Sequence, residues 1–597
     1  MSAAAANPQS GPDRPGTDDW NLIDVAVADR LASAFQLPGG IGDLNPLASM
    51  DSAAMMPAVA KAALGVVGQP ALLARVALKA ATAMAQTTAE AGVRAVSGPP
   101  ADEKRERERR FADPTWSGNA AYWWLKQAYR TCETSALDLV RSSGVDEATR
   151  NKAEFLVQSL IDAMAPTNIP LLNPAVRKRA LETGGRSLAR GAQNFIDDVR
   201  HNNGRPRQVM EGVYEVGKDM ACSPGKVVFR NDLMELIQYA PSTKTVHEIP
   251  LLISPPWINK YYVMDLAPDR SLVQWAVDHG HTVFMISYRN PDETMRGVLM
   301  DDYLISGPVE ALRVIGEITG AERVNLLALC LGGTLAMSTL AYLDALGEEH
   351  TGPAINSATF LNTLIDFSEP GILGVFTDEV TVSRLEKSMA KTGFLPKEDM
   401  QHTFNMLRAN DLIWNYVVSN WMMGEDPPAF DLLTWNNDST RMPAAMHSFY
   451  LRNCYLENRL AKGTLELAGT RLDPAEVDQD LYFLAAEQDH IAPWRSSYIG
   501  ARLPKGKVRF VLSNSGHIAG IVNPPNPKSV HYVREDGALP ESSQEWLDGA
   551  TKHAETWWED WARWIGERAG GERKPPRLGS TKHRPLGDAP GDYVREA

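Results

Sequence analysis

Apolar residues follow a helical spacing in the region from about Phe111 to Asn203. There they recur every three or four positions, the period of an amphipathic helix. One face of the stretch AAYWWLKQAYRTCETSALDLV carries Tyr122, Leu125, Tyr129 and Cys132. Such a stripe is more typical of a buried helix face than of a cofactor site, so the sequence predicts a helical domain with this stripe in its core.

The pattern changes after about Gly204, where short apolar runs alternate with helical stretches. The runs are VVFRN, EIPLLISPPW, HTVFMISYR, RVNLLALC, SATFLN, LYFLAAEQD and KVRFVLSN. Strands that alternate with helices are typical of a parallel sheet covered on both faces. A helical segment rich in Trp and Met, about residues 367–469, separates SATFLN from LYFLAAEQD. An insertion of this size predicts a cap domain over an active site.

The first hundred residues follow neither pattern closely. Residues 1 to about 50 are rich in Ala, Pro, Gly and Asp without a period, which indicates a flexible leader. The Ala-rich stretch from Met55 to Val96 favours helices, but charged residues and Pro70 interrupt it too often for a membrane span. Two interpretations stay open for it, a pair of packing helices or an amphipathic segment that seeks an apolar surface.

A Gly-Pro-Pro breaker followed by a mixed charge run, SGPPADEKRERERR, covers residues 97–110. This composition indicates a solvated linker or the start of a helix. We therefore predict a leader with helices over residues 1–100, a helical domain over 101–205 and an α/β domain over 206–597.

Composition narrows the class of protein. With 44% hydrophobic and 22% charged residues, the chain has the make-up of a folded globular protein. Its net charge of −14 disfavours a nucleic-acid partner. The four cysteines lack the close pairs of zinc sites and secreted disulfide frameworks, and the start lacks a secretory signal pattern. We expect a cytoplasmic protein without a metal site or a transmembrane segment.

The stretch RVNLLALCLGGTLAM, Arg323 to Met337, is the first candidate for chemistry. An apolar strand leads into a Gly-Gly turn and a helix of small residues, with Cys330 at the bend. This is the elbow that presents the nucleophile in α/β hydrolases, although Ala328 stands where the usual motif begins with glycine. A lone cysteine at a strand end is also typical of an inert buried thiol, so the elbow alone leaves both interpretations open.

Two later loops supply the partners that the elbow would need. In this fold the acid and then the histidine follow the nucleophile along the chain. Asp489 comes just after the apolar run LYFLAAEQ, and His517 lies in a Ser-Gly-His turn after the next run. We therefore predict an α/β-hydrolase fold with a helical cap, and Cys330, Asp489 and His517 as its catalytic residues. The neighbouring His490 is expected to be structural.

A thiol at the elbow suits acyl relay better than hydrolysis. An acyl group that moves from a thioester substrate onto Cys330 stays a thioester, so it remains activated for a second transfer. The developing oxyanion needs two donors. One is the backbone N–H of Leu331, which follows the nucleophile. We predict the Ile258 N–H, in the loop ISPPWINKYYVMDL, as the second; a plain Pro-Pro turn is the alternative.

Long stretches from Phe111 onward closely resemble the polyhydroxyalkanoate synthases of the long, single-polypeptide type (class I-like). Matching stretches include FADPTWSGNAAYWWLKQAY, PPWINKYYVMDL, SYRNPDETM, LCLGG, DLIWNYVVSNWMMGEDPPAFDLLTWNNDSTRMP, QDHIAPW and SGHIAGIVNPP. The resemblance implies an acyltransferase that polymerises 3-hydroxyacyl-CoA into a growing polyester and releases coenzyme A, which is part of the substrate rather than a cofactor. It also implies a homodimer at the surface of cytoplasmic polyester granules.

The same resemblance assigns roles to the predicted site. Cys330 matches the acylated nucleophile, His517 the general base, and Asp489 a carboxylate that either orients His517 or activates the attacking 3-hydroxyl. The chain departs from the family pattern at Ala328, where glycine is usual, and at Trp257, where a smaller or polar residue is common. We expect short-chain substrates such as 3-hydroxybutyryl-CoA.

Several alternatives remain at this stage. The fold could serve a hydrolase of thioesters or polyester, with water as the acceptor, or a non-catalytic granule-surface protein. Residues 288–290 of SYRNPD are expected to anchor a turn, with substrate contact as the alternative. The stretch WNNDST is expected to form cap core, again with substrate contact as the alternative.

Overall fold

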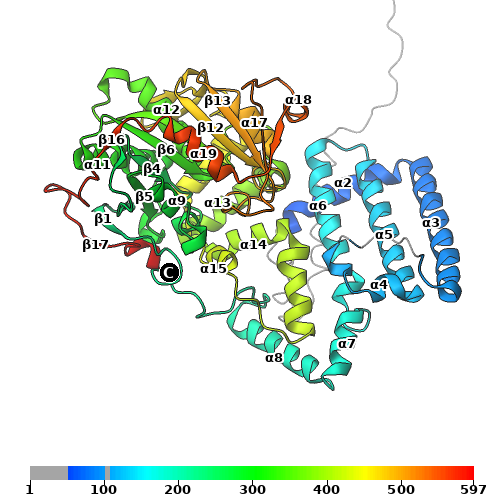
Figure 1. The fold of residues 1–597 in the computed structure, drawn as a ribbon. Coiled ribbons are helices and arrows are strands. Elements are labelled where there is room, and N and C mark those ends of the chain that lie inside the picture. Colours follow the sequence, from blue (N-terminus) through cyan, green and yellow to red (C-terminus); the bar gives the residue numbers. More distant parts are fainter. Residues whose placement is uncertain (1–51, 101–105, 107, 597) are drawn as a thin grey trace, which may run out of the picture. The chain divides into compact units, whose positions relative to one another are not determined.

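The computed structural model describes residues 52–100, 106 and 108–596, and the chain divides into two compact units, residues 1–205 and 206–597 (Figure 1). The predicted leader, residues 1 to about 50, lies outside the described residues. The described part of the first unit contains helices and no strand. Its helices are α2 (Ser52–Val67), α3 (Pro70–Ser97), α4 (Thr115–Gly118), α5 (Ala120–Arg141), α6 (Glu147–Ala163), α7 (Pro174–Glu182) and α8 (Arg186–His201).

The Ala-rich stretch forms two helices that pack within the first unit. Ala58 and Ala62 of α2 lie against Val140 of α5 and Ala153 of α6. This contact favours the interpretation as packing helices. Within the described ranges no single helix is long and apolar enough to cross a membrane; the bent pair Met55–Val67 and Pro70–Ser97, with 94° between the two helices, meets that criterion by length and composition.

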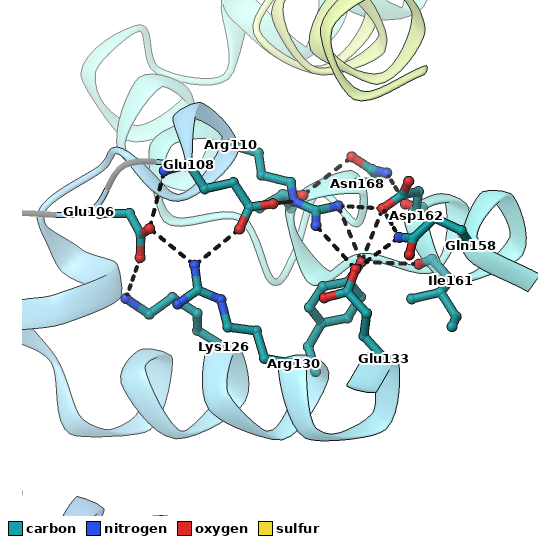
Figure 2. Close-up of polar contacts among 12 residues, drawn as sticks. Glu106, Glu108, Arg110, Lys126, Arg130, Glu133, Gln158, Ile161, Asp162 and Asn168 are labelled. Carbon is teal, nitrogen blue, oxygen red and sulfur yellow. Dashed lines mark hydrogen bonds and ion pairs between the residues drawn. The ribbon is translucent and has the colours of Figure 1, made fainter. Parts of the chain in front are cut away.

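Charged residues of the run before Phe111 are paired, as Figure 2 shows. Glu106 accepts hydrogen bonds from Lys126 at 3.1 Å and from Arg130 at 3.0 Å. Arg110 donates to Asp162 of α6 at 2.8 Å, and Glu108 bonds to both arginines. The side chain of Lys126 is only 4% exposed. The prediction of a solvated linker is therefore wrong for these residues, because their charges neutralise those of α5 and α6.

The buried face of α5 differs from the predicted stripe. Cys132 is exposed, whereas Trp123 and Lys126 are buried. The Arg94 guanidinium lies 4.2 Å from the centre of the Trp123 ring. The stripe prediction fails at Cys132 because long-range partners on α3 and at Glu106 decide which face of the helix is covered.

The second unit is built on one sheet of 11 strands. Six central strands are parallel, in the order β13, β12, β7, β6, β4 and β5, and antiparallel strands extend both edges. The strands are β1 (Gly225–Arg230), β2 (Met234–Tyr239), β4 (Leu251–Ser254), β5 (Val283–Tyr288), β6 (Arg323–Leu329), β7 (Ala354–Leu361), β12 (Asp480–Ala486), β13 (Val508–Ser513), β14 (His531–Val533), β15 (Thr551–His553) and β17 (Gly587–Asp588).

All seven predicted strands are confirmed, but a wholly parallel sheet is wrong. β2 was not predicted, although each of its residues is buried. Only residues 231–233 separate β1 from β2, and a connection this short can join strands only in the antiparallel sense. Successive residues of β6 point to two different apolar cores, with Leu326 and Ala328 on one face and Leu327 and Leu329 on the other.

Helices cover both faces of the sheet. The core that contains Ala328 also holds residues of α11 (Glu310–Thr319), α12 (Leu331–Leu346) and α17 (Trp494–Ala501), and the opposite core holds α9 (Leu272–Asp278) and α19 (Trp557–Gly566). The sequence thus folds as predicted, into an α/β-hydrolase sheet with a helical layer on each face. The remaining helices outside the cap segment are α10 (Met300–Leu304) and α18 (Ser543–Asp548).

The segment between β7 and β12 carries the elements that were predicted as a cap. Its helices are α13 (Glu379–Thr392), α14 (Lys397–Leu407), α15 (Asp431–Asn437) and α16 (Ala444–Tyr450), with π-helical turns at Asn410–Trp414, Val417–Met422 and Leu451–Leu456. Short strands β8 (Phe394–Leu395) and β9 (Met442–Pro443) pair with each other, as do β10 (Leu465–Leu467) and β11 (Thr470–Leu472). Outside this segment, β3 (Val246–His247) pairs with β16 (Glu572–Arg573) to form another two-stranded sheet.

Candidate active site

Cys330 occupies the sharp bend between β6 and α12. Its φ of 51° and ψ of −120° put a side chain in a backbone region that normally favours glycine. The Cys330 N–H donates to the Leu361 carbonyl at 2.9 Å, which ties the bend to the end of β7. Cys330 itself is partly exposed, while the residues of α12 that follow it are buried. The sequence prediction of a strand, a bend and a helix is confirmed.

Two glycines let the neighbouring backbone approach the bend. A Cβ on Gly332 would lie 2.4 Å from the Ser254 carbonyl oxygen and 2.6 Å from that of Pro255. A Cβ on Gly333 would lie 2.0 Å from the Thr363 hydroxyl oxygen. Both glycines lie inside the first turn of α12 rather than before it. Ala328 is fully buried and pairs in regular register with Ser254, so its methyl group fits within the sheet.

Asp489 and His517 meet on adjacent loops, after β12 and β13. His517 Nδ1 lies 2.6 Å from Asp489 Oδ2. The other carboxylate oxygen, Oδ1, accepts the backbone N–H groups of Ile491 at 2.8 Å and Ala492 at 2.9 Å. The loops are joined by backbone hydrogen bonds, one of which runs from the Gln488 N–H to the Ser515 carbonyl at 2.9 Å. Both oxygens of this carboxylate are therefore already engaged.

The imidazole of His517 lies between Asp489 and Cys330. Burial alone would lower its pKa, but the charges of Asp489 and Cys330, with hydrogen bonds to both, raise the pKa of His517 to about 10. Since Nδ1 is engaged by Asp489, Nε2 is the ring atom left for the thiol. The structure thus brings the three predicted residues together in the order Cys330, His517, Asp489.

The two predicted oxyanion donors belong to backbone segments that lie close together. Leu331 is the first residue of α12, so its N–H has no acceptor within the helix. Among the described residues, no hydrogen bond takes up the N–H of Leu331 or of Ile258. Pro255, three residues before Ile258, lies against Gly332, which places the start of this loop beside the elbow. Neither N–H group is therefore committed to a protein acceptor among the described residues.

Asn362 is a site residue that the sequence analysis missed. It directly follows β7 with a φ of 45°, and its side-chain amide donates to the backbone carbonyl of His517. Its own N–H donates to the Leu484 carbonyl at 2.8 Å. Asn362 therefore fixes the histidine loop to the sheet. The only signal in the sequence was a polar residue at the end of the predicted run SATFLN.

Two tyrosines of the segment between β7 and β12 lie close enough to Cys330 for its charge to affect their pKa. The rings of Tyr450 and Tyr455 lie 5.5 Å apart, and Phe367 packs at 5.9 Å and 4.9 Å from them. Burial raises the pKa of both tyrosines, and the charge of Cys330 adds to this effect. Burial also raises the pKa of Cys454 to about 12, so that thiol stays protonated.

His490 stays outside this arrangement. Its Nδ1 is buried and has no hydrogen-bond partner among the described residues. Burial outweighs the opposing charge of Asp489 and lowers the pKa of His490 to about 4. A neutral ring of this kind is consistent with the expected structural role.

The other residues singled out in the sequence lie around the loop of Ile258. Trp257 is 1% exposed, and its ring lies 4.9 Å from that of Tyr303 and 6.2 Å from that of Tyr288, so it belongs to the core. The side-chain oxygen of Asn290 accepts the backbone N–H of Arg441 at 3.0 Å. Asn290 thus anchors a turn, as expected.

A second group of potential ligands lies at one edge of the sheet. Ligand atoms of His531, His553 and Glu555 all lie within 4.8 Å of one another. Two of these side chains already have protein partners, since His553 lies 2.9 Å from Glu535 and Glu555 pairs with Arg563 at 2.5 Å. This group contributes nothing to the site at Cys330.

Comparisons with known proteins give two family matches. The model of the poly-beta-hydroxybutyrate polymerase (PhaC) N-terminus matches residues 107–276, and the α/β hydrolase fold model matches residues 251–524. A poly(3-hydroxyalkanoate) polymerase of Methylorubrum extorquens is 46% identical over 504 residues, which cover 84% of this chain and 82% of that protein. Polymerase subunits of Rhizobium meliloti (strain 1021) and Cupriavidus necator are 44% and 41% identical, covering 83% and 82% of this chain and 80% and 83% of their own lengths.

Proposed function

Because this chain belongs to the poly(3-hydroxyalkanoate) polymerase family and is a polyester-forming acyltransferase, we propose that it polymerises (R)-3-hydroxyacyl-CoA through a thioester on Cys330. The observation that carries the proposal is the contact of His517 with both Cys330 and Asp489 at the elbow. Coenzyme A enters as part of the substrate and leaves as a product, so the proposal includes no cofactor.

Acylation begins with the thiolate of Cys330 facing a protonated His517. The sulfur attacks the thioester carbonyl of the substrate, and the N–H groups of Leu331 and Ile258 hold the resulting oxyanion. When the tetrahedral species collapses, the bond to the coenzyme A sulfur breaks and His517 Nε2 gives that sulfur its proton. The acyl group is left on Cys330 as a thioester, while coenzyme A departs as a free thiol.

Elongation uses the same groups in reverse. The 3-hydroxyl of another unit gives its proton to His517 and attacks the acyl-Cys330 thioester. An ester bond forms, the bond to the Cys330 sulfur breaks, and the thiolate with its imidazolium partner is restored. A thioester suits this relay because its acyl group stays activated until a hydroxyl takes it.

We assign Asp489 to orienting His517 rather than to activating the hydroxyl itself. The support is the occupation of both carboxylate oxygens, one by His517 and the other by two backbone N–H groups. A carboxylate held in this way stabilises the imidazolium and fixes the ring tautomer. The 3-hydroxyl then meets His517 alone.

The proposal has three further parts. We propose that the substrates are short-chain, such as 3-hydroxybutyryl-CoA, that the protein is a homodimer, and that it lies on the surface of cytoplasmic polyester granules. The preference for short acyl groups rests on the resemblance of the chain to the long, single-polypeptide type. The last two features rest on membership of the family.

Incubation of the purified protein with 3-hydroxybutyryl-CoA tests this function. We expect release of coenzyme A together with insoluble polyester. Free 3-hydroxy acid would instead identify a hydrolase, and the absence of turnover a non-catalytic protein. Cys330→Ala should lower the rate by at least about 10³-fold, since the nucleophile is gone. Cys330→Ser should lose on the order of 10²-fold, and a serine variant at full rate would contradict the thioester argument.

A further inference from the structure

The stretch WNNDST and the arginine after it, residues 435–441, bind the loop that carries Ile258. We call residues 435–441 the clamp segment. The Trp435 indole N–H donates to the Lys260 carbonyl at 2.7 Å, and the Lys260 ammonium lies 2.8 Å from Asp438 Oδ1. Asn259 and Ser439 form an isolated β-bridge. The clamp segment therefore holds the loop at several points along its length.

One contact of the clamp segment falls on the peptide unit next to the predicted oxyanion donor. The hydroxyl of Thr440 donates to the backbone carbonyl of Trp257 at 2.7 Å. Both residues are buried, with Thr440 4% and Trp257 1% exposed. Water is thus kept from this hydrogen bond, and the carbonyl has a fixed partner.

The carbonyl of Trp257 and the N–H of Ile258 belong to the same peptide bond. Because a trans peptide is planar, the two groups point in opposite directions and rotate together. A hydrogen bond that fixes the direction of the carbonyl therefore fixes the direction of the N–H. It also polarises the amide, which strengthens the N–H as a donor.

We propose that Thr440 is a positioning residue, which aims the Ile258 N–H at the oxyanion by holding the Trp257 carbonyl. The inference rests on the proposed function and adds to it a side chain from the segment between β7 and β12. The Asp438 and Trp435 contacts already attach the clamp segment to the loop at Lys260. Loss of the Thr440 hydroxyl should therefore free one peptide unit without detaching the loop.

Two substitutions at position 440 separate the hydroxyl from the shape of the side chain. Thr440→Val keeps the shape but removes the donor, and Thr440→Ser keeps the donor. Removal of an entire oxyanion donor typically costs 10²–10³-fold in kcat, so misdirecting one should cost about 10–100-fold. We expect Thr440→Val to lower kcat for coenzyme A release by that factor with KM within about threefold, and Thr440→Ser to stay within about threefold of wild type.

Thr434→Val is the matched control. The Thr434 hydroxyl donates to the Phe430 carbonyl at 3.2 Å in a solvent-exposed hydrogen bond, so the same substitution there should leave kcat unchanged. A second readout is the rate at which iodoacetamide alkylates Cys330. This reaction needs the thiolate but forms no oxyanion, so Thr440→Val should alkylate at the wild-type rate.

The outcomes divide clearly. A selective loss of kcat in Thr440→Val, with normal alkylation and rescue by serine, supports the positioning role. A wild-type kcat in Thr440→Val, a change in KM alone, or an equal loss of turnover and alkylation overturns it. The proposed function itself is contradicted if the wild-type protein releases no coenzyme A or if Cys330→Ala remains active. Neither of these results involves Thr440, so failure of the proposed function can be told apart from failure of the positioning role.

Discussion

At the residue scale, the backbone of Cys330 is held in a conformation that a side chain rarely adopts. Such a conformation costs of the order of 1–3 kcal/mol, which the rest of the fold must offset. The hydrogen bond from the Cys330 N–H to Leu361 and the backbone contacts of Gly332 hold the bend in place. The strain has a use, because it turns the sulfur out of the strand and toward His517.

The raised pKa of His517 predicts a dependence of stability on pH. Relative to an ordinary histidine at 6.5, a pKa of about 10 means that the folded protein binds this proton more tightly than the unfolded chain. The contribution to the free energy of unfolding is therefore full below pH 6.5 and disappears as the pH rises through 10. In urea unfolding, the stability difference between wild type and His517→Gln should shrink steadily from pH 6.5 to 10.

Cys330→Ala provides a check on the cause of that shift. The charge of the thiolate is one source of the raised pKa, so in a Cys330→Ala background the decline should still begin near pH 6.5 but should be smaller and end at a lower pH. A stability difference that grows with pH would show that the proton on His517 is not favoured by folding.

At the element scale, Gly332 in the first turn of α12 packs directly against the backbone at the end of β4. The carbonyl oxygens that a Cβ would strike belong to the end of β4 and the Pro-Pro turn, and backbone cannot move aside as a flexible side chain can. The elbow therefore depends on the contact between three elements, the strand before it, the helix after it and the adjacent strand.

Gly332→Ala should destabilise the protein by about 1–3 kcal/mol, the usual cost of forcing an extra methyl group into a packed site. The measurement is the free energy of unfolding in urea, together with the rate of Cys330 alkylation. Gly566→Ala is the control, because a Cβ at that helical position meets nothing within 4 Å. That variant should be neutral or more stable by a few tenths of a kcal/mol, as alanine favours helix. Equal stability of the two variants would rule out the steric argument.

At the scale of the whole molecule, the chain keeps its chemistry and its charged helical network in different units. Cys330, Asp489, His517 and the two N–H donors all belong to residues 206–597. The network of Figure 2 belongs to the first unit, where the pKa of Glu106 is lowered to about 2. Burial opposes that shift, and hydrogen bonds from the Glu108 N–H, Lys126 and Arg130 outweigh it.

Glu106→Gln should therefore destabilise the first unit by about 1–3 kcal/mol at neutral pH, because it leaves Lys126 buried without its countercharge. The stabilising effect of Glu106 is present above pH 4.5 and is lost as the pH falls through 2, so the difference from wild type should fade in acid. Urea unfolding at pH 7 and pH 3 measures both. Glu147→Gln, whose side chain is 80% exposed, should change stability by less than about 0.5 kcal/mol.

The rate of Cys330 alkylation in Glu106→Gln should equal that of wild type, since Cys330, His517 and Asp489 all belong to the second unit. A parallel loss of alkylation would mean that the site depends on the network in the first unit.

Local patterns in the sequence determined much of this protein. Seven strands, the elbow at Cys330 and the order of Asp489 and His517 follow from short stretches, because apolar period and turn chemistry act over a few neighbouring residues. They also led to the prediction of Ile258 as a backbone donor, since its loop follows an earlier strand.

Tertiary structure alone decided the rest. Partners distant in sequence decide whether the charges near Glu106 are solvated and which face of α5 is covered. They also decide that Asn362 bonds to His517 and that Thr440 bonds to Trp257. β2 escaped detection because burial on both faces removes the alternation that marks a strand. The pattern of a sequence records which residues avoid water, whereas the choice of partner is made only when distant segments pack, because hydrogen bonds and ion pairs act at contact distance.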